Sequence, residues 1–115
     1  MTIDPDCIFC KIAGGEIPSK IFYQDDEVIA FHDIRPHAPV HFLIVPREHI
    51  PTLQDCGEHH QGLLGKMVAL APKLAAEQGI TNGFRVVVNN GQDGGQEVFH
   101  LHVHVMGGPR PWKIG

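Results

Sequence analysis

Three histidines alternate with aliphatic residues near the end of the chain, at His100, His102 and His104. If residues 98–106 form a β-strand, as their composition indicates, a spacing of two places all three imidazoles on one face. One histidine on a strand is usually an ordinary polar residue with a partner, but three in register are costly to bury without one. Imidazole serves in proton transfer, metal binding and nucleophilic attack near neutral pH. This segment is therefore the first candidate for a functional site.

Two kinds of chemistry compete for these side chains. A His-x-His pair spans about 7 Å along a strand and can chelate one metal ion, whereas three in line span about 13 Å, too far to share an ion easily. The preceding loop, residues 89–96, is rich in glycine, and its backbone N–H groups can converge on an anion. A phosphate cradle beside a row of imidazoles indicates phosphoryl or nucleotidyl transfer.

The cysteines offer a second candidate site. Three thiols are an odd number and do not make a disulfide framework, but Cys7 and Cys10 form a C-x-x-C motif. A redox role for this motif would need a neighbouring βαβ pattern, which the sequence lacks. A metal role would need two further ligands, and nine histidines in 115 residues supply candidates.

The elements that must position these residues follow from the hydrophobic pattern. We expect a helical turn at 7–13, strands at 20–24, 27–32, 41–46, 84–89 and 98–106, and one long helix at 55–78. Asp55 and Glu58 resemble a capping box at the start of that helix. One helix covers one face of an antiparallel sheet, so the predicted class is α+β, in a single domain over 1–115. The other face must be solvated, lined by a site or buried against a second copy.

Composition excludes several partners. A net charge of −4 argues against sequence-independent binding to nucleic acid or to an anionic membrane. No apolar run approaches the roughly 20 residues that span a bilayer. The N-terminus also lacks a basic stretch followed by an apolar one, so no secretory signal is visible. We therefore expect a cytoplasmic protein with neither a nucleic-acid nor a membrane partner.

The segment from His100 to Val105, HLHVHV, resembles the His-φ-His-φ-His-φ-φ signature of the histidine triad (HIT) superfamily, where φ is apolar. Residues 7–19, 30–50 and 83–108 resemble the N-terminal, central and C-terminal blocks of this family. The short length and the Trp-bearing tail are similar to the Hint-like branch of nucleoside phosphoramidases. The resemblance implies a five-stranded antiparallel sheet with one long and one short N-terminal helix, and a homodimer that joins two sheets.

The resemblance also implies a reaction on purine nucleoside 5′-phosphoramidates. His102 would attack the α-phosphorus and form a nucleotidyl-histidine, which water then hydrolyses, with no metal needed for the chemistry. His104 would contact the phosphate, and His100 and His41 would position the nucleophile. The implied phosphate cradle consists of Asn89, Gly95, Gln96 and the backbone N–H groups of Glu97 and Val98.

The nucleoside site is implied by residues further upstream. An apolar slot for the purine would be formed by Ile8, Phe9, Phe31, Ile34 and Leu43. Asp33 would accept both ribose hydroxyls, with His32 beside it, and Trp112 would lie near the partner's site in the homodimer. Without the resemblance, the apolar residues are interpreted as core and Asp33 as a turn residue.

Some family members carry a zinc site that Cys7, Cys10, His49 and His100 match, and these ligand types suit tetrahedral Zn²⁺. Because this set is expected far from the phosphate at His102, the zinc would stiffen the N-terminal segment and take no part in catalysis. Two buried thiols without a metal are the alternative.

One position departs from the family, and several functions stay open. Glu97 stands where several relatives carry a serine that contacts the leaving group, and a carboxylate there would repel phosphate unless it points away or is protonated. Only its backbone is therefore placed in the site. The alternatives are a dinucleoside polyphosphate hydrolase or nucleotidyl transferase of the same superfamily, a non-catalytic nucleotide-binding regulatory module, and a zinc-binding adaptor. His59 and His60 are expected to be solvated.

Overall fold

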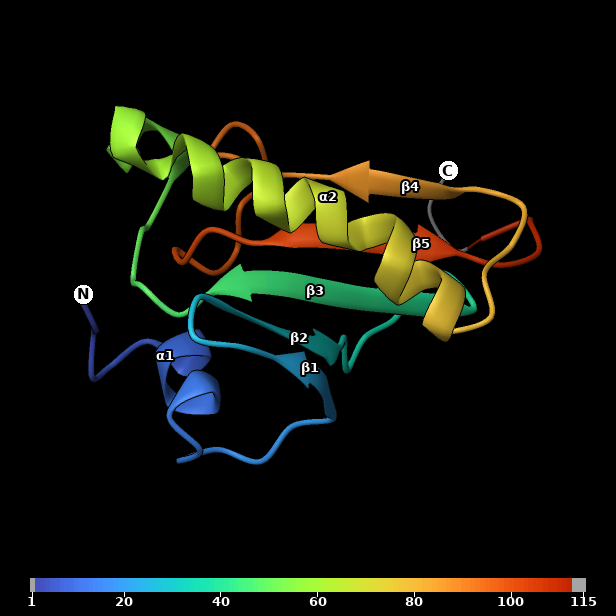
Figure 1. Cartoon of the computed structure of the whole chain (residues 1–115), viewed down its shortest axis with the longest axis horizontal. Coiled ribbons are helices and arrows are strands. Elements are labelled where there is room, and N and C mark those ends of the chain that lie inside the picture. The colour runs from blue at the N-terminus through green and yellow to red at the C-terminus, as the bar shows by residue number, and fades with distance from the viewer. Residues whose placement is uncertain (1, 113–115) are drawn as a thin grey trace.

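Five antiparallel strands form one sheet in the computed structural model, which describes residues 2–112 (Figure 1). The strands are β1 (Ile21–Gln24), β2 (Val28–His32), β3 (Val40–Pro46), β4 (Phe84–Val87) and β5 (Val103–Gly107), in the order β1-β2-β3-β5-β4. The helices are α1 (Ile8–Ala13) and α2 (Gln61–Glu77), with 3₁₀ turns at Leu53–Asp55 and Glu58–His60. The predicted α+β class and its helices are confirmed.

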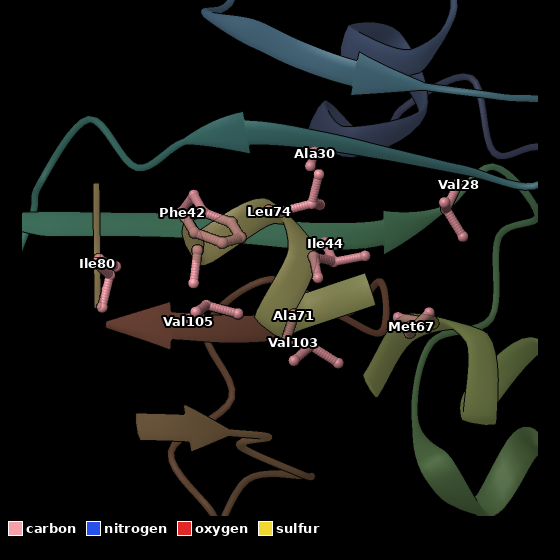
Figure 2. Close-up of a cluster of buried hydrophobic side chains, with 11 residues drawn as sticks. Val28, Ala30, Phe42, Ile44, Met67, Ala71, Leu74, Ile80, Val103 and Val105 are labelled. Carbon is pink, nitrogen blue, oxygen red and sulfur yellow. The ribbon is translucent and has the colours of Figure 1, made fainter. Parts of the chain in front are cut away.

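Helix α2 packs across one face of the sheet (Figure 2). Its apolar residues recur at helical spacing, so Met67, Ala71 and Leu74 point toward the strands. They join one buried cluster with Val28, Ala30, Phe42, Ile44, Val103 and Val105. Full burial of one such large side chain stabilises the fold by roughly 1.5–3 kcal/mol. The cluster therefore fixes β3 and β5, the central strands that carry His41 and His104.

The opposite face of the sheet is covered in part by α1. Successive residues of a strand point to opposite faces, so Phe42 and Ile44 of β3 face α2 while Leu43 and Val45 face α1. The α1 side contributes Cys7, Phe9, Cys10 and Ile12 to this second buried cluster. The sequence did not predict what covers this face, and the structure shows that α1 covers part of it.

The long helix begins later than the sequence indicates. The predicted range was 55–78, but α2 starts at Gln61, because Cys56 and Gly57 have extended backbone that interrupts the run. Asp55 belongs to an earlier cap, where its carboxylate accepts from the N–H (3.1 Å) and the hydroxyl (2.7 Å) of Thr52. The start signal was real, but it belongs to a 3₁₀ turn.

The prediction that His60 is solvated is wrong, because its side chain is buried. Its Nδ1 accepts the backbone N–H of Gly57 at 3.0 Å, and its Nε2 lies 3.3 Å from the Glu48 carboxylate. His59 beside it is exposed, as predicted. His60 thus ties the turn before α2 to the end of β3.

The last strand is shorter than the predicted range of 98–106. Strand β5 begins at Val103, whose partner on β3 is Ile44, and the ladder does not extend toward Pro46. Proline has no N–H to donate, and the N–H of Leu101 donates to the carbonyl of Ile50 at 2.7 Å. His100 and His102 therefore precede the strand. Strand β4 likewise ends at 87, short of the predicted 89.

The turn between β1 and β2 is bound to α2 through Asp25. Its carboxylate accepts the N–H groups of Glu27 (2.8 Å) and Val28 (2.9 Å), the Tyr23 hydroxyl (2.7 Å) and the Lys66 ammonium (2.8 Å). Burial alone would raise the pKa of Asp25, but these hydrogen bonds outweigh it and hold the pKa well below its usual range.

Helix α2 has 17 residues. No helix within residues 2–112 has the length and the hydrophobicity needed to cross a bilayer.

Candidate active site

The three alternating histidines lie in three different surroundings. His100 is fully buried and faces Cys7. His102 is 6 % exposed and packs edge-on against Phe9, with ring centroids 5.1 Å apart. His104, on β5, is half-buried and lies against His41. The predicted strand is wrong at His100 and His102, because β5 begins only at Val103, but the His102 ring still lies 4.9 Å from the His104 ring between centroids.

His102 has one ring nitrogen fixed by the backbone and the other without a partner among the described residues. Its Nδ1 lies 2.7 Å from the carbonyl oxygen of His100, so Nδ1 carries the proton and donates it. Nε2 then keeps the lone pair that a nucleophile needs, and it makes no hydrogen bond within residues 2–112. Burial lowers the pKa of His102, against a smaller opposing effect of the carbonyl, so the ring is neutral at pH 7.

A chain of hydrogen bonds sets the tautomers of His41 and His104. The backbone N–H of His37 donates to His41 Nδ1 at 3.1 Å, so the proton of neutral His41 lies on Nε2. That nitrogen is 3.0 Å from His104 Nδ1 and 3.4 Å from the Asp33 carboxylate. His104 therefore carries its own proton on Nε2, which lies 3.5 Å from Asn89 Nδ2; because both groups are then donors, they do not bond to each other and both can donate to a third group. Burial lowers the pKa of His104 to about 4, so this ring is a neutral donor.

Asp33, His41 and His104 also bring one donor atom each to within 4.8 Å of one another. A metal ion among them would need a lone pair on His41 Nε2, but that nitrogen carries the proton because Nδ1 accepts from the backbone. These three residues therefore form a hydrogen-bonded chain, and the donor set does not suit a metal.

The glycine-rich loop after β4 is held together by a buried amide. Gln96 is 7 % exposed, and its side chain accepts the N–H of Gly91 (2.8 Å) and donates to the carbonyls of Pro51 (2.7 Å) and Val98 (3.0 Å). Its backbone N–H donates to the Gly91 carbonyl at 3.0 Å. The loop itself uses these groups, so Gln96 shapes the cradle and leaves no donor free for phosphate.

Two backbone N–H groups at the end of this loop have no partner within residues 2–112. A Cβ at position 94 would collide with the backbone of Asn90, so only glycine fits, and Gly95 has φ +80°. Beyond them, the N–H groups of Glu97 and Val98 make no hydrogen bond within the described part of the chain. The Glu97 side chain is exposed. Free N–H groups after such a turn are suited to binding an anion.

Two hollows share the wall formed by His41. The larger, about 900 Å³, is lined by Pro18, Ser19, Lys20, His32, Asp33, Ile34, Pro36, Pro39, Val40 and His41. The smaller, about 340 Å³, is lined by His37, His41, Arg85, Val87, Asn89, His104 and Met106. His102 lines neither hollow; its ring lies 4.9 Å, between centroids, from the ring of His104, which lines the smaller one.

The residues predicted to hold a purine divide into two groups. Phe9, Phe31 and Leu43 are buried together beneath α1, and the Phe9 and Phe31 rings meet edge-on at 5.5 Å. Ile8 and Ile34 are 46 % and 88 % exposed and present apolar surface. The half-buried His32 ring instead packs on Phe22, with centroids 4.7 Å apart.

The C-x-x-C motif and two histidines converge on a single point. His100 Nδ1 lies 3.3 Å from Cys7 Sγ, 3.6 Å from Cys10 Sγ and 3.2 Å from His49 Nδ1, which is 3.5 Å from Cys10 Sγ. A tetrahedral Zn²⁺, bound at about 2.3 Å by sulfur and about 2.05 Å by nitrogen, would separate its ligand atoms by about 3.3–3.8 Å. The four side chains therefore fit such an ion.

The outer nitrogens of both histidines face acceptors, as metal-binding imidazoles require. His100 Nε2 donates to the carbonyl of Pro46 at 2.7 Å, so its Nδ1 keeps the lone pair, and His49 Nε2 lies 3.8 Å from the Asp4 carboxylate. The sequence did not predict Asp4 or Pro46 here, although an acid three residues before Cys7 is a readable signal. The sequence predicted this cluster far from the phosphate at His102. The structure joins the two through His100, whose ring faces the thiols and whose carbonyl contacts His102.

Trp112 lies against its own chain. Its Nε1 donates to the carbonyl of Gly108 at 3.0 Å, and the guanidinium groups of Arg85 and Arg110 lie 5.4 and 4.5 Å from the ring. These side chains line part of a third hollow of about 820 Å³. That Trp112 lies near a partner's site stays a prediction.

The sheet, its two helices and the histidines beside a glycine-rich loop define the class of histidine triad proteins. The HIT domain family matches residues 14–110. The chain belongs to this family of hydrolases and is an enzyme.

Individual relatives agree with this assignment. The chain is 49 % identical over 104 residues to the purine nucleoside phosphoramidase of Escherichia coli (strain K12), covering 90 % of this chain and 87 % of the relative. The structure of a histidine triad protein from Clostridium difficile matches with a TM-score of 0.89 and 47 % identity, over 94 % of this chain and 95 % of the other. A Zn-bound histidine triad family protein from Mycobacterium smegmatis matches with a TM-score of 0.79 and 30 % identity, over 89 % and 74 %.

Proposed function

We propose that the chain hydrolyses the P–N bond of purine nucleoside 5′-phosphoramidates through a nucleotidyl intermediate on His102. The observation that carries this proposal is the 2.7 Å contact between His102 Nδ1 and the His100 carbonyl. It holds the ring in the tautomer whose Nε2 is nucleophilic. The substrate class is supported by the name of the E. coli relative, a purine nucleoside phosphoramidase.

The reaction proceeds in two displacements. In the first, the lone pair of His102 Nε2 forms a bond to the α-phosphorus, the P–N bond breaks, and the departing amine takes a proton from solvent. In the second, water attacks the same phosphorus and gives up a proton to solvent, and the imidazole leaves with its Nε2 lone pair, which yields the nucleoside monophosphate. Imidazole suits both steps because it is a competent nucleophile and a good leaving group near pH 7.

The phosphate oxygens would be bound by neutral donors. The Nε2–H of His104 and the Nδ2 amide of Asn89 are two donors 3.5 Å apart, and the N–H groups of Glu97 and Val98, which have no partner within residues 2–112, follow the glycine loop. Donors that are already oriented stabilise the charge of the transition state without reorganising. His41 would take part indirectly, because it fixes the tautomer of His104 and its partners in the described part of the chain are His37, His104 and Asp33, not His102.

The nucleoside would occupy the larger hollow. Asp33 lies in its wall, half-buried, with the carboxylate that would accept the two ribose hydroxyls. The exposed side chains of Ile8 and Ile34 offer the apolar surface against which a purine would pack. The buried side chains of Phe9, Phe31 and Leu43 would support this apolar surface from the core and would not contact the purine directly.

Zn²⁺ is the metal we propose for Cys7, Cys10, His49 and His100. The inter-ligand distances, the outer acceptors on both histidines and the Zn-bound relative from M. smegmatis support this assignment. No step of the proposed reaction passes through the ion. Metal analysis of protein purified without added zinc is expected to give one zinc per chain, whereas a metal-free protein with reduced thiols would contradict it.

A homodimer is the assembly we propose. Strand β4 lies at the edge of the sheet and leaves Phe84 and Val86 36 % and 38 % exposed. An apolar edge strand invites pairing with another strand. Light scattering on the purified chain is expected to give twice the chain mass, and a monomeric mass would contradict the assembly.

Turnover of adenosine 5′-phosphoramidate tests the function. We expect release of ammonia and AMP by the wild type, and a loss of at least about 10³-fold in His102→Ala with AMP binding kept. Binding of AMP without turnover would instead favour a regulatory module. Faster cleavage of a dinucleoside polyphosphate than of the phosphoramidate would favour the other hydrolase activity of the superfamily.

The Glu97 side chain has its own test. Its carboxylate is exposed, and we propose that only its backbone N–H serves the reaction. Glu97→Gln keeps the shape and removes the charge, so turnover within about twofold of the wild type is expected. A large loss would assign the carboxyl a role in protonating the leaving amine.

A further inference from the structure

We propose that the cluster of Cys7, Cys10, His49 and His100 orients the nucleophile, so that Zn²⁺ bound there sets the reactivity of His102. The inference rests on the proposed function and adds to it a control by metal loading. It contrasts with a purely structural role for the cluster, in which the ion would only stiffen the N-terminal segment.

The first connection runs through a single residue. The ring of His100 supplies Nδ1 to the cluster, while its backbone carbonyl accepts the Nδ1 proton of His102 at 2.7 Å. The ring is fully buried and is anchored on its other side by the carbonyl of Pro46. Because the ring is fully buried and anchored on both sides, a displacement of His100 as a whole toward or away from the two thiols moves the carbonyl that fixes the tautomer of His102.

The second connection runs through Phe9, which lies between the two cysteines. Its ring packs edge-on against His102, with centroids 5.1 Å apart at an angle of 87°, and it touches the His100 ring at 5.8 Å. Cys7 caps the start of α1 through its sulfur, which accepts the Cys10 N–H at 3.4 Å. The turn that carries the thiols thus also holds one side of the nucleophile.

Metal loading would tighten both connections at once. The four donor atoms approach one another through weak hydrogen bonds to sulfur and through one contact between two imidazole nitrogens, none of which fixes a side chain as a metal–ligand bond does. Ligation fixes the position of each ligand side chain within a narrow range. His100 is then a positioning residue, which acts through its carbonyl and not by contact with the substrate. Outer positions of this kind typically change activity by about 10–100-fold.

Nitrogen NMR of the whole chain with ¹⁵N-labelled histidine tests the coupling without relying on activity. Zinc-loaded protein is expected to show His102 as one tautomer with the proton on Nδ1. After removal of zinc by a chelator, the same resonances are expected to report a mixture of tautomers, and added Zn²⁺ should reverse the change. His102 resonances that are identical in both states would overturn the inference.

Variants assign the effect to this cluster. His49→Ala removes a ligand that does not touch His102. Even with zinc present, this variant is expected to show the mixture of His102 tautomers seen in zinc-free wild type. His49→Cys supplies a thiolate ligand instead and should restore the single His102 tautomer of the zinc-loaded protein. In a Cys7→Ser, Cys10→Ser double variant, added zinc should leave His102 unchanged, and a response there would contradict the proposal. If the variants fail to fold, the NMR comparison of wild-type protein before chelation, after chelation and after reloading with Zn²⁺ tests the coupling by itself.

A kinetic measurement separates this inference from the proposed function. The rate of nucleotidyl-histidine formation from adenosine 5′-phosphoramidate is expected to fall about tenfold on chelation, with little change in AMP affinity. The same rate in both states, with the intermediate formed, would overturn the coupling and leave the function intact. No intermediate in either state, with a tautomer change seen by NMR, would overturn the function and leave the coupling intact.

Discussion

The Nε2 of His41 lies 3.0 Å from Nδ1 of His104, and this contact determines which nitrogen of His104 carries a proton. Because the backbone N–H of His37 occupies the other nitrogen of His41, the direction of donation along the chain is fixed. The half-buried His104 ring thereby becomes a neutral donor at Nε2. The backbone thus selects a tautomer two side chains away.

Replacing His41 should weaken catalysis through His104. His41→Ala leaves His104 free to adopt either tautomer, so kcat/KM for a phosphoramidate should fall by about 10–100-fold. His41→Gln is the matched control, because its amide can still donate to His104 Nδ1 and should retain most of the activity. Steady-state kinetics on both variants check this. Equal losses in the two variants would contradict the role of the donated proton.

Gln96 should prove essential for the shape of the loop. Gln96→Glu replaces the donor that faces the carbonyls of Pro51 and Val98 with an acceptor, which should lower the free energy of unfolding by about 2–3 kcal/mol. AMP affinity should fall as well, because the free N–H groups lose their orientation. Gln92→Glu adds the same charge at an exposed site of the loop and should have little effect on unfolding in urea. Similar losses in both variants would point to charge alone.

Stability should fall as the solution is acidified from about pH 7 to about pH 4.5. Burial lowers the pKa of His104 to about 4 in the folded protein, below the usual 6.5. In that interval the unfolded chain binds protons that the folded chain does not, so acid favours unfolding. Urea unfolding at several pH values measures the slope. Constant stability down to about pH 5 would contradict the burial of neutral imidazoles.

Asp25 should contribute stability that disappears at still lower pH. Its pKa is held below the usual value, so the contribution is full above about pH 4 and is lost as the pH falls further. Asp25→Asn should cost about 1–2 kcal/mol at pH 7, with a smaller difference from the wild type at pH 3. Asp26→Asn, at an exposed neighbour, is the control and should be near neutral. A cost for Asp25→Asn that is independent of pH would contradict the electrostatic explanation.

Much of the fold could be predicted because its signals are local. The continuous apolar run of 41–46 predicted an inner strand, and β3 is indeed buried on both faces. The stripe from Leu63 to Ala75 predicted the long helix. The start of β5 could not be predicted in the same way, because it depends on where Pro46 ends the ladder on a strand distant in sequence.

The types of residue in the candidate site were also readable, but their surroundings were not. Alternation drew attention to His100, His102 and His104, and their C-x-x-C and loop neighbours were visible too. Which ring nitrogen carries a proton depends on contacts over long sequence separations, such as that between His41 and His104. The burial of His60 against Glu48 has the same origin. Such contacts leave no periodic pattern in a single sequence.

Capture of the covalent intermediate tests the central claim most directly. Wild-type protein is mixed with adenosine 5′-phosphoramidate, quenched within the first turnover and analysed by peptide mass spectrometry. The account predicts an AMP adduct on His102, formed at least as fast as steady-state turnover and missing from His102→Ala. Turnover that proceeds with no adduct on His102, or that persists undiminished in His102→Ala, would contradict it.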